Sequence, residues 1–206
     1  MKSFRKLMAS QVLLPIVQAD TPEQGVAIAG AMVRAGLNLI EVVLRTEASL
    51  EALKAIKKAY PSLIVGAGTI TSKEILREAK AAGADFIITP AISANLLAEL
   101  STCDLPVLPG VSNTADILLA SEFGFNELKL FPASLSGGAA FISAMSSIFS
   151  DISFCPTGGV NQENRSDYLA LANCFAIGGS WVAPKNWEEN GEWDKITEAC
   201  KLANQR

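Results

Sequence analysis

The chain contains no histidine among its 206 residues. Histidine is the commonest protein ligand for metals and the commonest general acid–base group near neutral pH. Its absence also excludes nucleophiles that are activated in Ser-His or Cys-His pairs. Any catalysis must therefore depend on lysine, glutamate, aspartate, tyrosine, cysteine or backbone groups.

Signatures of metal and cofactor binding are missing as well. The four cysteines, Cys103, Cys155, Cys174 and Cys200, have no C-x-x-C or other close spacing. We therefore expect reduced cysteines in the core and no metal site. The chain also lacks a G-x-G-x-x-G fingerprint, which argues against a bound dinucleotide. No cofactor is predicted.

Long apolar runs and clusters of basic residues are absent. The apolar stretches are strand-sized or interrupted by polar residues, which argues against a membrane span. The start at Met1 lacks the charged-then-apolar pattern of a signal peptide, so we expect a cytoplasmic protein. The net charge is −4 and the pI is about 5.0. Without a basic patch, neither nucleic acid nor an anionic membrane is expected as a partner.

Short apolar runs that alternate with helix-like segments make up most of the chain. It is 50% hydrophobic and 18% charged, which is typical of a compact domain with a large core. A strand followed by a helix occurs eight times, at intervals of roughly 21 to 26 residues. The expected strands are 12–17, 37–45, 63–68, 86–89, 107–110, 128–131, 153–157 and 175–177. The expected helices are 25–35 with Thr21 as N-cap, 48–59, 72–82, 93–100, 114–123, 138–149, 162–171 and 193–204.

The expected strands are near-continuous apolar runs, which is typical of a parallel sheet buried on both faces. Eight strand–helix units predict an α/β fold, a closed (β/α)8 TIM barrel, although the chain is shorter than the roughly 250 residues typical of that fold. Its loops must therefore be short. No linker or change of composition marks a second domain. Residues 1–206 are expected to form one barrel domain, with a short N-terminal helix in the basic, amphipathic residues 1–9.

Lys129 lies in the middle of an expected strand, within the sequence Glu-Leu-Lys-Leu-Phe-Pro of residues 127–132. An unpaired buried ammonium costs more free energy than the packing of one residue returns. The lysine must therefore be paired, partly solvated in a cavity, or held neutral for chemistry. Phe131 is expected on the same face of the strand. Glu127, at the start of the strand, is expected to lie outside any site.

Two further charged residues belong to the second expected strand. Glu41 and Arg45 are four residues apart, and the period of two along a strand places both inside the barrel. Taken alone, they are equally consistent with an internal ion pair that has no further role. The presence of Lys129 inside the same barrel favours a functional site.

In such barrels, functional residues gather where strands end. The third strand ends in Gly-Ala-Gly-Thr at 66–69, where glycines let a ligand approach the backbone and the Thr69 hydroxyl can bind it. A plain turn with Thr69 near the helix cap is the alternative. Thr-Pro at 89–90 and Pro-Gly at 109–110 are interpreted as loop geometry.

Paired glycines occur at the ends of the last two expected strands, as Thr-Gly-Gly at 157–159 and Gly-Gly-Ser at 178–180. Barrels of this kind commonly bind phosphate there, through backbone N–H groups and a helix N-terminus. Simple tight turns are the alternative. The occurrence of two pairs at these two positions favours a phosphate site.

A lysine inside a barrel, beside a carboxylate, an arginine and a phosphate site, fits a Schiff-base nucleophile best. Desolvation or a neighbouring cation such as Arg45 favours the neutral amine, which forms an iminium with a carbonyl substrate. Glu41 would supply the proton transfers. Two alternatives remain. One is a phosphosugar isomerase or decarboxylase with Glu41 as base and Lys129 as an electrostatic partner, and the other is a non-catalytic phospho-ligand sensor.

Five motifs together resemble the KDPG/KHG aldolases, bacterial class I aldolases that act on 2-keto-3-deoxy-6-phosphogluconate (KDPG) and 4-hydroxy-2-oxoglutarate (KHG). They are EVVLRT at 41–46, GAGT at 66–69, LKLFPA at 128–133, PTGGV at 156–160 and GGSW at 178–181. The resemblance covers about residues 12–181. It implies a small-molecule 2-keto acid substrate, independence from metal, and a homotrimer.

The resemblance also implies roles for individual residues. Lys129 is the implied Schiff-base lysine and Glu41 the implied general acid–base. Arg45 and Thr69 are implied ligands of the carboxylate end of the pyruvyl group, with Thr157 nearby. The complete set of expected substrate-binding residues is Arg45, Thr69, Pro90, Phe131 and Thr157, and the expected phosphate-binding residues are Gly158, Gly159, Gly179 and Ser180.

The chain departs from the family pattern in three places. Val43 stands where threonine is common, Ala91 where glycine is usual, and Ser-Asn-Thr at 112–114 replaces a more usual Thr-Pro turn. None of these changes removes a proposed catalytic group. They concern the residues expected near the aldehyde end of the substrate and therefore its specificity. The related phosphogalactonate aldolases are a near alternative, although the sequences around Thr157 and Ser180 look more like the phosphogluconate type.

Overall fold

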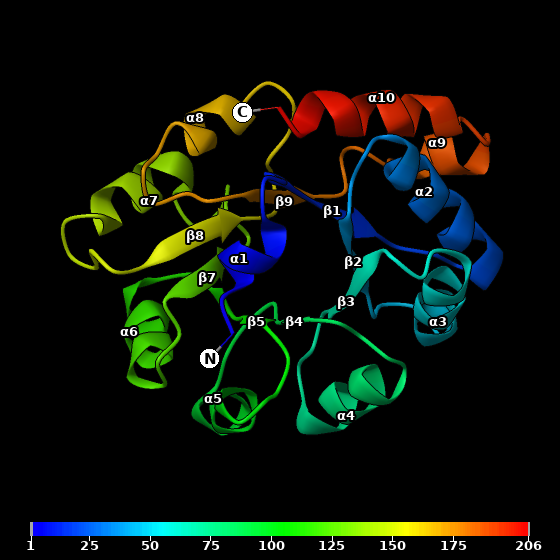
Figure 1. Ribbon diagram of the computed structural model, residues 1–206. Coiled ribbons are helices and arrows are strands. Elements are labelled where there is room, and N and C mark those ends of the chain that lie inside the picture. Colours follow the sequence, from blue (N-terminus) through cyan, green and yellow to red (C-terminus); the bar gives the residue numbers. More distant parts are fainter. Residues whose placement is uncertain (1, 206) are drawn as a thin grey trace.

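The structure, a computed structural model, describes residues 2–205, and within this range it is an α/β barrel (Figure 1). Nine parallel strands of the described residues form the ring, and the helices other than α1 surround it. The strands are β1 (Leu13–Val17), β2 (Leu39–Val43), β3 (Ile64–Gly68), β4 (Ile87–Ile88), β5 (Val107–Leu108), β6 (Gly110–Val111), β7 (Glu127–Leu130), β8 (Ser153–Pro156) and β9 (Ile177–Gly179).

The ring closes in two places. Strands β5-β4-β3-β2-β1-β9 pair in that order, and β6-β7-β8 form a second group. Pro109 joins the groups on one side: it separates β5 from β6, while its carbonyl still accepts a hydrogen bond from the Lys129 N–H at 2.8 Å. Isolated bridges Phe154–Cys174 and Thr157–Gly178 close the other side. The expected strand 107–110 is therefore split in two, because proline has no N–H to donate to a ladder.

The helices follow the strands in the expected alternation. They are α1 (Phe4–Met8), α2 (Pro22–Arg34), α3 (Ser49–Ala59), α4 (Lys73–Ala81), α5 (Ala94–Ser101), α6 (Thr114–Glu122), α7 (Gly138–Met145), α8 (Arg165–Leu169), α9 (Lys185–Glu189) and α10 (Trp193–Ala203). The side chain of Thr21 accepts a hydrogen bond from the Gln24 N–H, which confirms the predicted N-cap of α2. Ser72, Ser93 and Asn113 cap α4, α5 and α6 in the same way. The five-residue α9 was not predicted.

Helix α1 lies across one end of the ring, at its centre in Figure 1. Phe4 is fully buried there and meets Phe86 edge to face, with ring centroids 5.1 Å apart. The carboxylate of Glu127 accepts hydrogen bonds from the Ser3 hydroxyl and from the backbone N–H groups of Phe4 and Arg5. Glu127 begins β7, so this end of the barrel is the one where the strands start.

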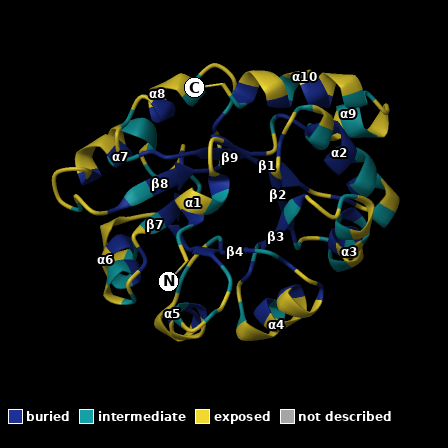
Figure 2. Ribbon diagram, in the orientation of Figure 1, coloured by how far each residue is buried: buried dark blue, intermediate teal, exposed yellow. Residues whose placement is uncertain are grey.

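Burial follows the expected layering, with buried strands inside and helices exposed on their outer faces (Figure 2). Every residue of β1, β2 and β9 is buried. None of the helices in the described part of the chain has both the length and the apolar character that crossing a membrane requires.

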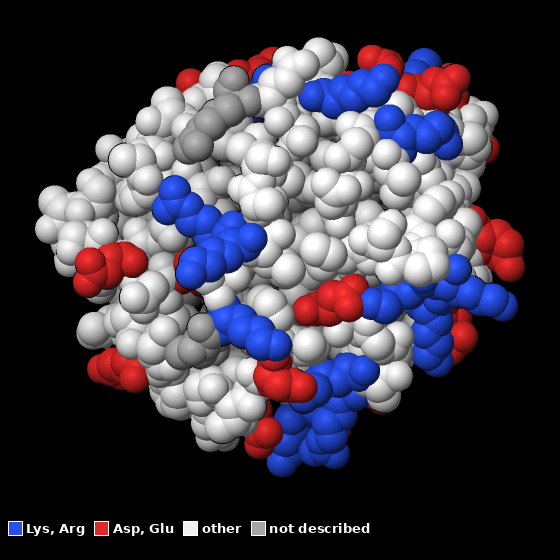
Figure 3. All heavy atoms as spheres, in the orientation of Figure 1, with Lys and Arg blue, Asp and Glu red and all other residues white. Residues whose placement is uncertain are grey.

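Charged side chains of both signs are interspersed on the face drawn in Figure 3. Two ion pairs, Lys57–Asp85 and Lys80–Asp104, each span 2.6 Å and tie a helix to the segment before a later strand.

Two strand ends differ from expectation in ways that affect the site. Strand β2 stops at Val43, two residues short of Arg45. Strand β9 covers Ile177–Gly179 instead of 175–177, because Leu14 and Pro15 of β1 pair with Gly178 and Gly179. These two glycines therefore lie within a strand and not in a turn after it.

Candidate active site

Lys129 on β7 and Glu41 on β2 meet inside the barrel. Lys129 is 3% exposed and Glu41 is fully buried. The lysine Nζ lies 3.3 Å from Glu41 Oε1. This contact confirms that Lys129 points inward and reaches Glu41, and it shows how the chain accommodates a buried ammonium: a carboxylate faces it, so neither charge is buried without a partner.

Two buried polar atoms near this pair have no hydrogen-bond partner among the described residues. They are Glu41 Oε2 and Thr157 Oγ1. A buried polar group left without a partner costs about 1–3 kcal/mol, so native structures rarely keep one without a reason. Both residues were predicted to belong to the site, and Thr157 also lines the hollow described next.

A hollow of about 280 Å³ opens where the strands end. It brings together eight of the predicted residues: Arg45, Lys129, Phe131, Thr157, Gly158, Gly159, Gly179 and Ser180. Lys129 Nζ lies over the Phe131 ring, 5.3 Å from its centroid, which confirms that the two side chains share a face of the chain. A cation over an aromatic face is electrostatically favourable.

The position of Arg45 corrects an expectation. Arg45 does not point into the barrel interior; it follows the end of β2, is exposed, and lies on the rim of the hollow. Within the described residues no contact joins it to Glu41, so the alternative of an internal Glu41–Arg45 pair is wrong. The Leu44 N–H still bonds the Gly68 carbonyl of β3, and the chain then leaves the ladder at Arg45, whose N–H bonds the Val43 carbonyl of its own segment.

Arg45 instead contacts Thr69. Its Nε donates to Thr69 Oγ1 at 3.2 Å, which brings these two predicted ligands together. Thr69 has φ +65°, in the left-handed region that residues other than glycine seldom adopt. Holding it there costs on the order of 1 kcal/mol or more, and the surrounding backbone keeps it in that conformation.

Three predicted residues, Glu41, Thr69 and Pro90, are not among those lining the hollow. Glu41 and Thr69 each contact a residue that does line it, Lys129 and Arg45 respectively, whereas no such contact involves Pro90 among the described residues. Its neighbour Thr89 is fully buried, and the Thr89 hydroxyl accepts a hydrogen bond from the Gly110 N–H at 2.9 Å. This contact supports the interpretation of both segments as loop geometry. A role of Pro90 toward substrate stays a prediction.

The cysteines contribute no nucleophile to this site. Cys155 is opposite Lys129 in the β7–β8 register and is fully buried. Burial raises the pKa of the Cys155 thiol strongly, so it stays protonated at neutral pH. Cys174 and Cys200 are also buried and Cys103 is half-buried, as expected of reduced residues largely in the core.

Sequence reasoning missed several residues of the hollow. Gln18 follows the last residue of β1 and lines it, as do Ile16, Val160 and Trp181. Gln18 could have been predicted, because it directly follows the first apolar run and polar residues at strand ends often carry function. The apolar residues carry no comparable signal in the sequence.

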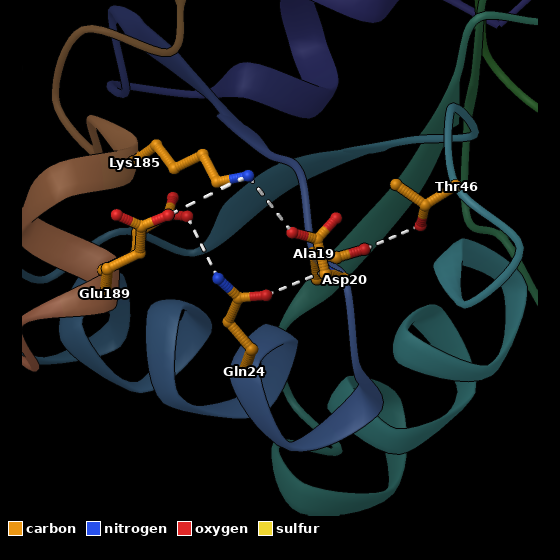
Figure 4. A network of polar contacts seen from close by, with 7 residues as sticks. Ala19, Asp20, Gln24, Thr46, Lys185 and Glu189 are labelled. Carbon is orange, nitrogen blue, oxygen red and sulfur yellow. Dashed lines mark hydrogen bonds and ion pairs between the residues drawn. The ribbon is translucent and has the colours of Figure 1, made fainter.

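A second hollow of about 260 Å³ adjoins the first and shares Gln18, Ser180 and Trp181 with it. Around it, a polar network links α9 to the segment after β1 (Figure 4). Lys185 Nζ lies 3.5 Å from Asp20 Oδ2, and Gln24 Nε2 donates to Glu188 Oε2 at 3.2 Å. Burial, together with the nearby Asp20 charge, raises the pKa of Glu188 to about 7.

The fold and the site define a class: enzymes that work at the carboxyl ends of a parallel α/β barrel with a buried lysine and carboxylate, the arrangement that Schiff-base lyases use. The sequence model of the family described as KDPG and KHG aldolase matches residues 5–199. The chain belongs to the KDPG/KHG aldolase family, whose members are lyases.

Similar proteins agree with this assignment. A 2-dehydro-3-deoxy-phosphogluconate aldolase of Pseudoalteromonas atlantica is 40% identical over 201 residues, which cover 98% of this chain and 94% of the relative. A KHG/KDPG aldolase of Escherichia coli (strain K12) is 37% identical with the same coverage. The crystal structure of KDPG aldolase from Legionella pneumophila, with pyruvate captured at low pH as a covalent carbinolamine intermediate, has a TM-score of 0.95 and 32% identity and covers 99% of both chains.

Proposed function

We propose that this chain is a class I aldolase that cleaves KDPG to pyruvate and glyceraldehyde 3-phosphate. The observation that carries the proposal is the buried Lys129 Nζ, which lines the hollow and lies 3.3 Å from Glu41 Oε1. An amine that attacks a ketone must first lose its proton, and a carboxylate at this distance is placed to accept it.

The proposed reaction begins with attack of Lys129 Nζ on the C2 ketone. The carbinolamine hydroxyl then leaves as water with the proton that Glu41 accepted from the lysine, which restores the carboxylate. The resulting iminium withdraws electrons from the C3–C4 bond. Glu41 takes the proton of the C4 hydroxyl, the C3–C4 bond breaks, and glyceraldehyde 3-phosphate leaves. The enamine of pyruvate is then protonated at C3 by Glu41, and water hydrolyses the iminium to release pyruvate and the free lysine.

The other residues of the hollow would hold the two ends of the substrate. Arg45 and Thr69, joined by their 3.2 Å hydrogen bond, would bind the carboxylate next to C2, with Thr157 Oγ1 as a further polar contact. The backbone at Gly158, Gly159 and Gly179 and the Ser180 side chain would bind the phosphate. Phe131 lies against the lysine between these two ends.

KHG is a second candidate substrate, because the matching family is described by both substrates and the Escherichia coli relative carries both names. Its cleavage would give pyruvate and glyoxylate by the same steps. KHG has no phosphate, so Ser180 and the paired glycines would contribute little to its binding. Cleavage rates on KDPG, KHG and the phosphogalactonate analogue would rank the three.

Trapping with borohydride tests the chemistry directly. Incubation with pyruvate and borohydride should give a stable reduced pyruvyl adduct, located on Lys129 by peptide mass mapping, and a Lys129→Met variant should give none. An isomerase, a decarboxylase or a phospho-ligand sensor would form no such adduct. Failure to trap any adduct between about pH 6 and pH 9, on either side of neutral working pH, would overturn the aldolase mechanism.

The proposal extends to a homotrimer. Three of the four large apolar side chains that stand exposed among the described residues belong to α6, to the segment before α7 or to the segment after it: Leu118 is 53%, Leu135 85% and Ile148 64% accessible. Exposed apolar side chains are candidates for an interface. Light scattering should give three times the 21.7 kDa chain mass. Replacing Leu135 with aspartate should lower that mass if this surface forms the interface.

A further inference from the structure

Gly68, the last residue of β3, lies directly against the side chain of Glu41. A Cβ atom added to Gly68 would lie 1.9 Å from Glu41 Oε1, 2.7 Å from Cδ and 2.9 Å from Cγ. Cβ atoms do not approach other heavy atoms so closely, so a residue larger than glycine would force the carboxylate to move.

The backbone gives no other reason for glycine at this position. Gly68 is not among the glycines with positive φ, and it pairs with Val43 in a regular parallel ladder. Any residue adopts such a strand conformation. Space for the Glu41 side chain is therefore what position 68 requires.

The Glu41 carboxylate, which Gly68 leaves room for, has few contacts that fix its position. Glu41 is fully buried, Oε1 has Lys129 as its partner, and Oε2 has none among the described residues. No second hydrogen bond fixes its rotamer, so packing must do so. The bare Cα of Gly68 provides the space in which the carboxylate reaches the lysine.

The same arrangement occurs a second time, at Gly178 on β9. A Cβ atom there would lie 2.4 Å from Thr157 Oγ1, and Gly178 also has no positive φ. Glu41 Oε2 and Thr157 Oγ1 are the two buried side-chain polar atoms without a partner in the described part of the chain. Each of these two side chains thus occupies the space that a Cβ atom on the facing strand glycine would need.

Other strand glycines face different neighbours. A Cβ at Gly66 would meet the Phe86 ring at 2.0 Å, and one at Gly179 would meet the Trp181 ring at 2.2 Å. Gly66 and Gly179 therefore leave space for the packing of aromatic rings. At Gly68 and Gly178, by contrast, the side chain that would be displaced carries a buried polar atom without a hydrogen-bond partner among the described residues.

We infer that Gly68 and Gly178 are positioning residues for this site, because their missing side chains set the rotamers of Glu41 and Thr157. The inference rests on the proposed function, and it adds to it two residues that bind nothing themselves. Gly68 would act on proton transfer through Glu41, and Gly178 on substrate orientation through Thr157.

Gly68→Ala tests the inference with KDPG cleavage as the readout. Displacement of a catalytic group by about 1 Å costs on the order of 100-fold in rate, so kcat should fall by about that factor while KM changes little. The matched control is Gly30→Ala on α2, where the new Cβ would lie 2.4 Å from the Tyr60 hydroxyl, outside the barrel interior. It should keep kcat within about twofold of the parent.

A double-mutant cycle separates positioning from a general loss of packing. In Glu41→Ala the three atoms that the new Cβ would meet, Oε1, Cδ and Cγ, are all removed. Adding Gly68→Ala to that variant should therefore cost less than about threefold in kcat, against about 100-fold in the parent. Equal losses in both backgrounds, or a folded Gly68→Ala enzyme with full kcat, would overturn the inference.

If Gly68→Ala does not fold, a double-mutant cycle between Gly178 and Thr157 still tests the inference. Gly178→Ala should lower kcat/KM in the parent and have little further effect on Thr157→Ala, which lacks the displaced hydroxyl. Additive losses there would refute it. Parent enzyme that neither cleaves KDPG nor traps pyruvate would instead refute the proposed function, so the two failures are distinguishable.

Discussion

At the scale of the residue, Glu41 and Lys129 constrain each other. Both are buried, and each is the charged partner that the other has in the structure. Removing one charge from a buried pair leaves the other uncompensated, which is strongly unfavourable. Conservative, isosteric changes are therefore the informative ones at these positions.

Glu41→Gln should lower kcat for KDPG cleavage by about 10²- to 10⁴-fold, the range that general acid–base groups contribute. The amide oxygen still accepts a hydrogen bond from Lys129, but the amide cannot take a proton from the C4 hydroxyl. Steady-state release of pyruvate measures the effect. Glu47→Gln, an exposed carboxylate beyond the end of β2, is the control, and a Glu41→Gln enzyme within tenfold of the parent would exclude Glu41 as the acid–base.

Ser180→Asp should separate the two candidate substrates. A carboxylate beside the proposed phosphate position would place like charges together, so kcat/KM for KDPG should fall by about tenfold or more, which corresponds to about 1.4 kcal/mol. The same variant should cleave KHG within about twofold of the parent, because KHG places no phosphate there. Ser180→Asn is the neutral control. Equal losses on both substrates would contradict the phosphate assignment.

At the scale of the element, α1 depends on one carboxylate from a distant strand. Glu127 satisfies the Phe4 and Arg5 N–H groups and the Ser3 hydroxyl, and a five-residue helix has little stability of its own. Phe4 then fills the end of the barrel beside Phe86. The first residue of β7 thus anchors a helix while the third residue, Lys129, faces the site.

Glu127→Ala should lower the free energy of unfolding by about 1–2 kcal/mol, the usual cost of losing a charged cap. Urea unfolding followed by tryptophan fluorescence measures it, and Glu163→Ala, with an exposed carboxylate, serves as the reference. The kcat for KDPG should stay within about twofold of the parent in both. A large loss of kcat with unchanged stability would place Glu127 in the active site.

The expected elements show what the sequence could specify. Apolar runs predicted eight strands because burial on both faces selects for them, and this pattern located Lys129 and Glu41 correctly. Arg45 was misplaced because periodicity does not show where a ladder ends; here β2 ends in a tight turn in which the Arg45 N–H bonds the Val43 carbonyl. Gly178 and Gly179 looked like a turn because glycine carries no strand signal, although pairing with β1 makes them a strand.

At the scale of the whole molecule, stability and chemistry occupy opposite ends of the barrel. Glu127 and α1 lie where the strands begin, and the hollow lies where they end. The second hollow, around α9, belongs to the chemical end and contains Glu188, a half-buried carboxyl beside Asp20, Lys185 and Glu189. The titration of Glu188 should change the free energy of unfolding of the whole protein with pH.

Burial raises the pKa of Glu188 from its ordinary 4.5 to about 7. The folded protein then binds more protons than the unfolded chain between these values. The contribution of Glu188 to stability is therefore full below about pH 4.5 and is lost as pH rises through about 7. Glu188→Gln removes this dependence, so its stability relative to the parent should improve from pH 4.5 to pH 8, by about 1 kcal/mol after allowance for solvent screening.

Urea unfolding of parent and variant across this pH range gives the difference directly. Glu189→Gln is the matched control, because Glu189 is exposed on the same helix and its 3.9 Å contact with Lys185 is long. The parent–control difference should stay flat from pH 4.5 to pH 8, while the parent–Glu188→Gln difference should change steadily between pH 5 and pH 7. A flat Glu188 profile would mean that water reaches this carboxyl freely, and that the polar network of α9 leaves the second hollow open to solvent.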